Sequence, residues 1–551
     1  MNTPLIDISP DQWAIVHKIL QQHVPQHEVW AFGSRAQWTA KEYSDLDLVV
    51  ITDKPLPLDV VASLKEDFSE SDLPWKVDIL DWATTSESFR KIIERDKVVV
   101  RESKRGLGMS SEWSRVTVEE ITSKVAMGPF GSNIKVSTFV PSGVPIISGE
   151  HLRGTKVQDG RFNFITEEHA EKLKNSLVLR GDVIFTHAGN IGQVAVIPET
   201  SRYERYIISQ RQFFGRCKRE LVLPEYLTYF FHSPEGKHKL LSNASQVGVP
   251  SIARPSSHLK SIEVPLPSID CQHAICDVLS VLENRIDHNR TLATNLEAIA
   301  RRLFKSWFVN FDPVRAKAAG DKPPGLADDI AALFPDRLVD SELGEVPEGW
   351  SYKPITKIAS VLSGGTPKRS VAEYWDGDIP WYSVVDSPQK GDLFVVQTSD
   401  YITEEGLKKS AAKLLPPGTT ILSARGTVGK LALTCGPMTI NQSCYALKGA
   451  LGDYFTHFTI SNSIEWLKQN VHGAVFDTIT KSTLDEMIVV APPEDIAQAF
   501  EKVINPLMTK IESSVRERII LSSIRNILLP RLISGKIRVS DAQAQIEEAL
   551  T

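Results

Sequence analysis

Three acidic residues near the start of the chain are spaced as a metal site would require. Asp45 and Asp47 stand two apart at the head of the apolar run Leu46 to Ile51, which predicts a strand, so their side chains share one face. Carboxylates on one face repel each other unless a cation lies between them. Asp78 is the central carboxylate of a second strand-like run, Val77 to Leu80. Three carboxylates on neighbouring strands would form an oxygen-rich Mg²⁺ site.

A glycine–serine pair precedes these carboxylates. Gly33 and Ser34 follow an apolar run that ends at Phe32 and predict a turn into a short helix. Backbone N–H groups at such a helix start could hold a triphosphate. Together with the metal, this favours transfer of a nucleotidyl group, in which metal ions orient the attacking group and the leaving pyrophosphate. The alternative is a domain that keeps the fold as a docking module, with Asp45 and Asp47 as solvated charges.

Residues 11–100 resemble the minimal nucleotidyltransferase family of the polymerase-beta superfamily. The resemblance rests on Gly-Ser followed about ten residues later by Asp-x-Asp. It implies Mg²⁺ and a nucleoside triphosphate as cofactors, with these roles: Asp45, Asp47 and Asp78 for metal binding and catalysis, and Gly33 and Ser34 for nucleotide binding. Asp81 competes as third ligand but follows the apolar strand, so Asp78 is preferred. Members are often antitoxins that act beside a helical toxin and sometimes adenylylate it, and nothing in this chain resembles that toxin.

The remainder of the chain contains an internal repeat. Its first part keeps a separation of 237 residues and its later part a separation of 225 residues. The matched pairs are Trp113 with Trp350, Ile165–Glu168 with Ile402–Glu405, Gly189 and Gly192 with Gly426 and Gly429, and Leu259–Val264 with Leu484–Val489. The four glycines predict tight turns rather than ligand contacts. The repeat unit is a glycine-punctuated domain followed by one long helix.

Each long helix carries an apolar stripe with spacings of three and four, from Ile275 to Leu303 and from Phe500 to Leu528. A helix from Asp270 to Trp307 would be ~57 Å long at ~1.5 Å per residue, longer than a compact domain of this size. We therefore expect the two helices to pair as an antiparallel coiled coil, with Ile286 and Ile511 on the seam, rather than to pack on their own domains. The aromatic end from Leu303 to Phe311 fits a further partner and ordinary core packing equally well.

The repeat, about residues 111–539, resembles the specificity subunit of type I restriction-modification enzymes. The motifs that carry the resemblance are Gly364-Gly365-Thr366-Pro367, Tyr374 to Trp381, Gly426-Thr427-Val428-Gly429, Asn441-Gln442 and Leu528 to Gly535. The first copy departs from the Gly-Gly-Thr-Pro form and has Met127 to Ser132 instead. The resemblance implies two target-recognition domains that each read half of a bipartite site in double-stranded DNA. It also implies docking of adenine methyltransferase subunits and restriction/translocase subunits on the spacer helices.

The expected fold is an α/β multidomain protein in which two long antiparallel spacer helices join two α/β target-recognition domains behind a small nucleotidyltransferase-like α/β domain. The expected boundaries are 1–105 for the nucleotidyltransferase-like domain, 111–268 for target-recognition domain 1, 269–312 for spacer helix 1, 313–349 for a linker with at most short helices, 350–493 for target-recognition domain 2 and 494–540 for spacer helix 2. The stretch Arg101 to Ser111 predicts a hinge.

Recognition loops should hold phosphates through Lys and Arg, while contacts to base edges give specificity. The candidates are Lys124, Asn133 and Lys135 in the first copy and Lys368, Arg369 and Lys390 in the second. For each of them the alternative is a solvated surface residue. No catalytic constellation occurs in the repeat, so this region is expected to bind without a cofactor.

Composition narrows the class of protein. The chain has 551 residues, 42% of them hydrophobic, and a net charge of −6, so it is globular and its bulk charge does not indicate nucleic-acid binding. No apolar run approaches the ~18–20 residues that cross a bilayer, and five scattered cysteines favour a reducing cytoplasm. Two other functions stay open: a nucleotidyltransferase or antitoxin-like enzyme that the repeat delivers to DNA or to a restriction complex, and an orphan DNA-binding scaffold.

Overall fold

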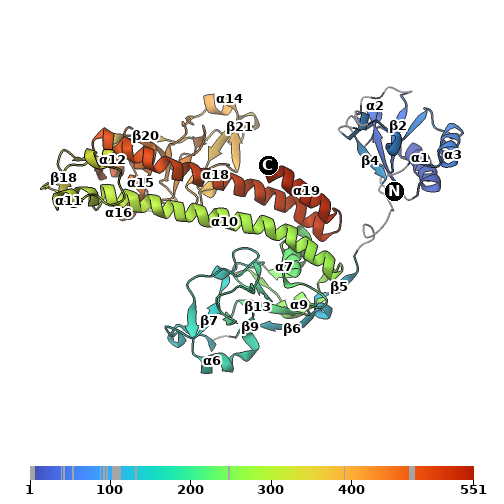
Figure 1. The fold of residues 1–551 in the computed structure, drawn as a ribbon, viewed down its shortest axis with the longest axis horizontal. Helices are drawn as coiled ribbons and strands as arrows, with labels where there is room; N and C mark the ends of the chain where they lie inside the picture. Colours follow the sequence, from blue (N-terminus) through green and yellow to red (C-terminus); the bar gives the residue numbers. More distant parts are fainter. Residues whose placement is uncertain are drawn as a thin grey trace. The chain divides into compact units, whose positions relative to one another are not determined.

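The chain divides into two compact units in the computed structural model (Figure 1). One unit comprises Met1–Gln272 with Pro530–Gln545, and the other comprises His273–Leu529 with Ile546–Thr551. The structure describes residues 6–25, 27–38, 40, 44–52, 55–86, 89–90, 93–94, 97–101, 113–130, 133–245, 248–389, 391–470 and 478–550.

The first hundred residues form a four-stranded sheet of order β3-β2-β1-β4. Strand β2 pairs parallel with β3 and antiparallel with β1. The strands are β1 (Glu28–Phe32), β2 (Leu46–Ile51), β3 (Val77–Asp81) and β4 (Val98–Arg101). Helices α1 (Pro10–His23) and α3 (Leu58–Ser69) share a core with the sheet that includes Trp13, Leu20 and Phe68. The apolar runs around Phe32, Leu46 and Ile79 are therefore strands, as predicted.

Arg101 belongs to this domain rather than to a hinge. Its guanidinium donates hydrogen bonds to Gln21 Oε1 and to the carbonyl of Pro25, both at 3.1 Å, and burial lowers the pKa of Arg101. The sequence suggested a hinge because Arg101 adjoins a glycine- and serine-rich stretch, but β4 carries the chain through this residue. Residues 102–111 of the expected hinge lie outside the described residues.

The first copy of the repeat contains two four-stranded sheets, with orders β11-β10-β13-β6 and β8-β7-β12-β9. The strands are β6 (Thr122–Met127), β7 (Val144–Ile147), β8 (Asn163–Ile165), β9 (Leu177–Leu179), β10 (Asp182–Thr186), β11 (Val194–Val196), β12 (Arg205–Ile208) and β13 (Gln212–Cys217). Side chains of both sheets, including Ile184, Tyr206 and Phe214, share one buried cluster.

Short elements complete the first copy. Strand β5 pairs antiparallel with β16, and β14 with β15. Their bounds and those of the helices are β5 (Arg115–Thr117), α5 (Val118–Ile121), α6 (Glu167–Lys172), α7 (Pro224–His232), α8 (Pro234–Leu241), β14 (Ala244–Ser245), β15 (Ser251–Ile252), α9 (Pro255–Ser261) and β16 (Glu263–Pro265).

The second copy repeats this topology. Its sheets have the orders β20-β27-β24-β25-β22 and β23-β21-β26, and β19 pairs with β28. The strands are β19 (Ser351–Pro354), β20 (Ala359–Ser363), β21 (Trp375–Tyr382), β22 (Phe394–Val395), β23 (Asp400–Ile402), β24 (Thr420–Ser423), β25 (Leu431–Thr434), β26 (Thr439–Ile440), β27 (Cys444–Gly449) and β28 (Ile488–Ala491). The helices are α13 (Ile355–Ile358), α14 (Glu404–Lys408), α15 (Asp453–Asn462), α16 (Ile464–Gln469) and α17 (Lys481–Glu486). The four strands β20, β27, β24 and β25 keep the order of β6, β13, β10 and β11, so the repeat seen in the sequence is a repeat of fold.

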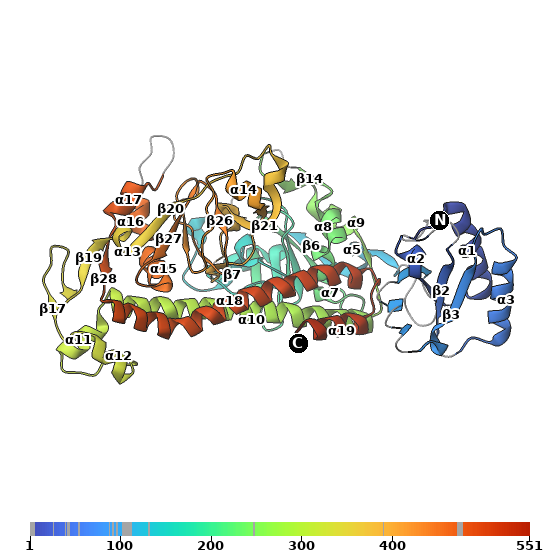
Figure 2. The ribbon, with the colours of Figure 1, turned by 90° about the horizontal axis from the view of Figure 1, so that it is seen from above.

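Two 40-residue helices, α10 (Ile269–Phe308) and α18 (Glu494–Ile533), run side by side as a rod (Figures 1 and 2). Arg285 Nε lies 2.6 Å from Glu517 Oε1, and Phe304 packs on Phe500 with 5.9 Å between ring centroids. Residue numbers rise along one helix as they fall along its partner, so the pair is antiparallel, as predicted. Ile286 and Ile511 are buried, whereas Ile299, which continues the apolar stripe, is 50% exposed.

The helices end earlier than the expected boundaries of 312 and 540. Phe311 adopts a left-handed backbone conformation with φ 59°, which stops α10 before the short helix α11 (Asp312–Ala318). The segment up to 349 contains two short helices, α11 and α12 (Asp328–Leu333), and a two-stranded ladder that the sequence did not suggest, β17 (Leu338–Val339) with β18 (Val346–Pro347). After α18, the chain turns at Gly535 into α19 (Val539–Leu550).

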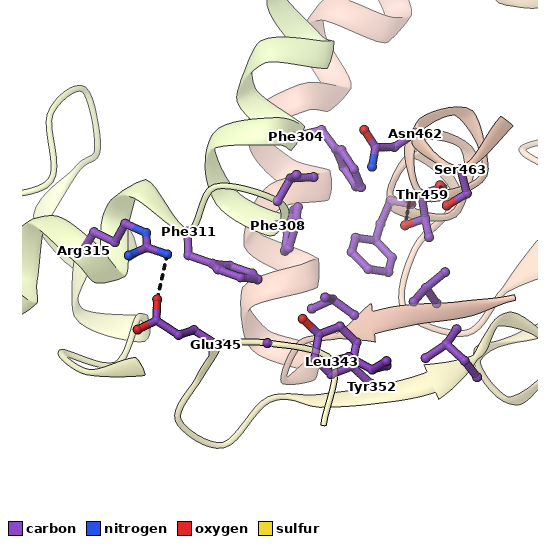
Figure 3. Close-up of a pocket in the computed structure, with 16 residues that line it drawn as sticks. Phe304, Phe308, Phe311, Arg315, Leu343, Glu345, Tyr352, Thr459, Asn462 and Ser463 are labelled. Carbon is purple, nitrogen blue, oxygen red and sulfur yellow. Dashed lines mark hydrogen bonds and ion pairs between the residues drawn. The ribbon is translucent and has the colours of Figure 1, made fainter. Parts of the chain in front are cut away.

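The aromatic end of α10 packs into the core of the second unit. Phe304, Trp307, Phe308 and Phe311 are all at most 5% exposed, so core packing rather than a further partner accounts for them. A cavity of about 390 Å³ opens beside three of these rings, and an ion pair of 3.1 Å between Arg315 and Glu345 stands at its side (Figure 3). Among the described residues, no helix is long and apolar enough to cross a membrane.

Candidate functional site

The glycine–serine pair and the carboxylates meet at one edge of the first sheet. Gly33 opens the short helix α2 (Gly33–Ala36) with φ +73°. A Cβ on Gly33 would lie 2.3 Å from Asp47 Oδ2, so the backbone at this turn directly adjoins the carboxylate. Both the positive φ and this close approach require glycine. The predicted turn and helix are therefore present, and they place Asp47 beside a helix start.

The carboxylates repel one another, as the sequence argument required. Asp47 and Asp78 are direct partners in the parallel register of β2 and β3. Burial, then the charges of Asp78 and Asp45, raise the pKa of Asp47, while Lys76 opposes the rise. Asp45 precedes the first residue of β2 and is exposed, so it adjoins the strand rather than standing within it.

Asp81 serves the fold and is not available as a ligand. Its carboxylate accepts hydrogen bonds from the backbone N–H of Leu56 at 2.6 Å and of Ala83 at 3.0 Å, and also from Thr52. Asp78 instead has its side chain 46% exposed and forms a 2.5 Å ion pair with Lys76. The preference for Asp78 over Asp81 as third carboxylate agrees with these contacts.

Carboxylate oxygens are the donors that Mg²⁺ prefers, and the raised pKa of Asp47 indicates an excess of negative charge that a cation would relieve. The donor types therefore fit a divalent ion. Within the described part of the chain, however, no three acidic, histidine or cysteine side chains stand close enough together to hold a metal. An incoming cation would have to displace Lys76 from Asp78 and draw the carboxylates together.

Arg35 is a site residue that the sequence argument missed. Its side chain is 5% exposed and lies over Trp75, with 4.4 Å between the guanidinium carbon and the ring centroid. Arg35 Nε donates to the carbonyl of Ser44 at 2.8 Å, next to Asp45. Arg35 thereby fixes the backbone from which the carboxylate pair projects. Its position directly after Gly33-Ser34 was the available signal.

In the first copy, five segments distant in sequence meet at one end of the two sheets. Gly128 N–H donates to Gln212 O at 2.8 Å, Ser209 N–H donates to Ile147 O at 2.9 Å, and His187 N–H donates to Arg211 O at 2.9 Å. Further bonds of 2.9 Å join Gln193 Nε2 to Gly149 O and Gly189 N–H to Pro250 O. We call residues 128, 147–149, 187–193, 209–212 and 250–252 loop junction 1.

The second copy builds the same junction. Gly365 N–H donates to Ile440 O at 2.9 Å, Asn441 N–H to Tyr382 O at 2.9 Å, and Ala424 N–H to Ser443 O at 2.8 Å. Ile479 N–H donates to Ala424 O at 2.9 Å, and Thr366 bonds to Gln442. Residues 364–366, 382–383, 424–429, 441–443 and 478–479 form loop junction 2. The turn glycines of both junctions have positive φ: Gly189, Gly192, Gly426 and Gly429.

Each junction presents a cation and amide groups to solvent. Arg211 and Gln210 are exposed in junction 1, and Arg425 and Gln442 in junction 2. Neither arginine has an ion-pair partner among the described residues. An unpaired guanidinium beside amides offers donors that suit both phosphates and the acceptor edge of guanine.

The residues proposed from the sequence to contact DNA lie mostly elsewhere. Lys124 stands within β6 opposite Arg216, toward the strand end away from Gly128. Asn133 and Lys135 are exposed, and the Asn133 carbonyl pairs with His169 Nε2 of α6 at 2.8 Å.

In the second copy, Lys368 is exposed two residues beyond loop junction 2. Arg369 is already engaged, because it pairs with Asp400 at 2.6 Å and stacks 3.7 Å above Trp375. Lys390 lies outside the described residues. Arg211 and Arg425, which the structure brings into the junctions, carried no signal in the sequence beyond their places beside Ser209-Gln210 and Gly426.

Comparison with known proteins covers both parts of the chain. A family model described as type I restriction modification DNA specificity domain matches residues 111–298 and 347–519, and one described as polymerase beta nucleotidyltransferase matches residues 15–105. The specificity subunit of the type I restriction enzyme HindI of Haemophilus influenzae is 25% identical over 412 residues, which cover 65% of this chain and 87% of that protein. The MjaIX specificity subunit of Methanocaldococcus jannaschii is 25% identical over 439 residues, covering 78% of this chain and 94% of that protein. The probable protein adenylyltransferase MntA of Haemophilus influenzae is 57% identical over 100 residues, covering 18% of this chain and 88% of that protein.

Proposed function

The chain belongs to the type I restriction-modification DNA specificity family, and we propose that its two copies read the two halves of a bipartite site in double-stranded DNA. The observation that carries this proposal is the recurrence of one loop junction in both copies with different exposed side chains. Loop junction 1 presents Arg211 and loop junction 2 presents Arg425, at positions that do not correspond in the repeat. Two readers with one framework and different donors suit two different half-sites.

The rod of α10 and α18 supports the same proposal. A rigid spacer between two readers sets the distance between half-sites, as subunit geometry does in dimeric DNA-binding proteins. The rod also offers long exposed faces on which adenine methyltransferase and restriction/translocase subunits would assemble, in the cytoplasm where the DNA lies. In this assignment the specificity region binds DNA, and its partners perform the chemistry.

Arginine substitutions test the two readers separately. Arg211→Ala should weaken binding by about 1–3 kcal/mol and relax the preferred bases in one half-site only, and Arg425→Ala should do so in the other half-site. The measurement selects random DNA duplexes with the purified full chain and sequences the bound fraction. Arg205→Ala and Arg337→Ala, which remove exposed arginines paired with Glu167 and Glu348, are the matched controls. A single uninterrupted palindrome as the wild-type motif would contradict a bipartite site.

For the first domain we propose Mg²⁺-dependent transfer of a nucleotidyl group from a nucleoside triphosphate to a protein acceptor. The proposal rests on the contact of Gly33 with Asp47, on the register of Asp47 with Asp78, and on the similarity to MntA. Asp45, Asp47 and Asp78 would hold the ion, and the backbone at Gly33 and Ser34 would hold the triphosphate.

Asp47→Asn should abolish this transfer, because it removes a ligand and the charge that retains the ion. Labelled triphosphates with Mg²⁺, incubated with the full chain alone and with cell extract, provide the measurement. Asp72→Asn, which alters an exposed carboxylate of the same domain, is the control. DNA selection should be the same for both variants. Label transfer that survives Asp47→Asn would refute the site.

A further inference from the structure

The second copy is clamped to both helices of the rod by the segment that leads into β22. Gly391 has φ +91°, and a Cβ there would lie 2.3 Å from Thr294 Oγ1 on α10. Directly after it, the carboxylate of Asp392 forms an ion pair with Arg518 on α18. The exposed fractions of these two side chains are 8% and 13%, so the pair is withdrawn from solvent.

This clamp is joined stiffly to loop junction 2. The carbonyl of Leu393 accepts a hydrogen bond from Leu433 N–H at 2.7 Å, and β22 continues as a parallel partner of β25. The turn 424–429 lies between β24 and β25, which pair antiparallel. Leu393 and Phe394 also belong to one buried cluster with Ala293 and Val515 of the rod. A displacement at Asp392 is therefore transmitted through the sheet to Arg425.

The packing around the clamp leaves room for such a displacement. A cavity of about 410 Å³ borders Asp392 together with Arg301 and His457, and a second of about 320 Å³ borders Asp392 together with Arg290 and Arg518. Apolar contact is non-directional, and it does not by itself select one docking angle beside such spaces. A buried ion pair adds little net stability, because desolvation offsets the attraction, but its geometry is specific.

We propose that Asp392 and Arg518 are a positioning pair that fixes the angle of the second reader on the rod, and with it the separation at which the second half-site is accepted. The proposal rests on the bipartite reading proposed above. One base pair of added spacing moves a half-site by about 3.4 Å along the DNA axis and rotates it by about 35°, so a small change of angle is enough to change the accepted spacing. The first copy has the uncharged Gly154 and Thr155 in the matching stretch and Ala293 in place of Arg518, so the device belongs to the second copy.

The test measures spacing as well as affinity. Duplexes carrying the wild-type motif with the separation changed by zero, one or two base pairs in either direction compete for the full chain. Wild type should prefer one separation. Asp392→Asn and Arg518→Gln should each lower the preference for that separation over its neighbours at least tenfold, while the preferred bases in both half-sites stay the same. Asp392→Arg combined with Arg518→Asp should restore part of the preference.

Controls separate positioning from stability. Arg337→Gln breaks an exposed ion pair of the same unit and should leave the spacing preference unchanged. Thermal unfolding of each variant identifies any that is not folded, and Arg518→Lys, which keeps the charge but loses the planar fork, then replaces it. Folded single variants with the wild-type spacing preference would overturn the proposal. Wild-type binding that ignores the separation would instead overturn the bipartite reading itself.

Discussion

The two copies of the repeat build the same loop junction and present different arginines from it. In the first copy Arg211 follows Ser209-Gln210, and the aligned place after Asn441-Gln442 in the second copy holds Ser443. In the second copy Arg425 precedes the glycine turn, where the first copy has Ala188. Backbone hydrogen bonds and turn glycines are kept, because they form the junction, while the side chains that face solvent are free to move between loops. Duplication has thus preserved a platform and exchanged what stands on it.

The copies also differ in their buried residues. Counting back from Ser233 and Ser463, the residues that precede α8 and α16, His457 of α15 corresponds to Leu227 of α7. On the rod, Glu501 of α18 corresponds to Cys276 of α10 at the separation of 225. Two positions filled by an apolar or weakly polar residue in the first copy carry buried ionisable groups in the second. The second copy therefore joins its helices through a polar interface, and substitutions there test whether that polarity is costly.

The largest effect is expected where the copies agree. Ile286→Asp and Ile511→Asp should each destabilise the second unit by about 3–5 kcal/mol, because both side chains are at most 4% exposed and an unpaired buried charge is costly. Assembly with methyltransferase subunits should weaken with it. Urea unfolding followed by circular dichroism gives the free energy.

Exposed isoleucines of the same helices provide the controls for this pair. Ile299→Asp and Ile520→Asp, at side chains 50% and 54% exposed, should change stability by less than about 0.5 kcal/mol. An Ile286→Asp protein that melts like wild type would remove Ile286 from the seam of the rod.

Glu501 should make the stability of the second unit depend on pH. Burial raises the pKa of Glu501 to about 7, although its carboxylate accepts a hydrogen bond from Phe455 N–H at 2.7 Å. A group whose pKa is raised by folding stabilises fully below its unfolded pKa, near 4.5, and loses that contribution as pH rises through about 7. Glu501→Gln keeps the acceptor without the charge, so it should be more stable than wild type by about 3 kcal/mol at pH 8.5.

The difference between Glu501→Gln and wild type should shrink toward zero near pH 5. Thermal unfolding at pH 5, 7 and 8.5 measures it. Glu405→Gln, at an exposed position of α14, should show no such trend. Equal gains for Glu501→Gln at all three pH values would mean that ionisation of Glu501 is not the cause.

His457→Leu copies the first repeat and should give the smallest effect. His457 is 1% exposed, neither ring nitrogen has a hydrogen-bond partner among the described residues, and burial, helped by Arg301, lowers its pKa to about 3. Replacing a neutral, unsatisfied imidazole by an apolar side chain should stabilise the unit by about 1–3 kcal/mol, seen as a higher melting temperature. Leu227→His, at a side chain with no exposure, should destabilise the first copy. A loss of stability in His457→Leu would show that the imidazole is satisfied within the adjoining cavity.

Much of the architecture was predictable, because it depends on local patterns. Repeated separations of 237 and 225 residues predicted two equivalent domains and two helices, and Gly33 predicted a turn that only glycine permits. The antiparallel rod followed from the length of the apolar stripes. The stripe misplaced Ile299, because the face that a helix buries depends on which neighbour lies against it.

The amino-acid sequence by itself determined the repeat, the strands that carry Asp47 and Asp78, and the helical rod, since periodicity, turn glycines and paired carboxylates act over a few residues. Tertiary structure alone decided which side chains stand together. It placed Arg101 in a core, bound Asp81 to backbone N–H groups, paired Arg369 with Asp400, and carried Arg211 and Arg425 into the loop junctions. Charge and polarity are visible in a sequence, but whether a guanidinium is buried, paired or free depends on contacts between residues far apart along the chain, and only the folded chain brings those residues together.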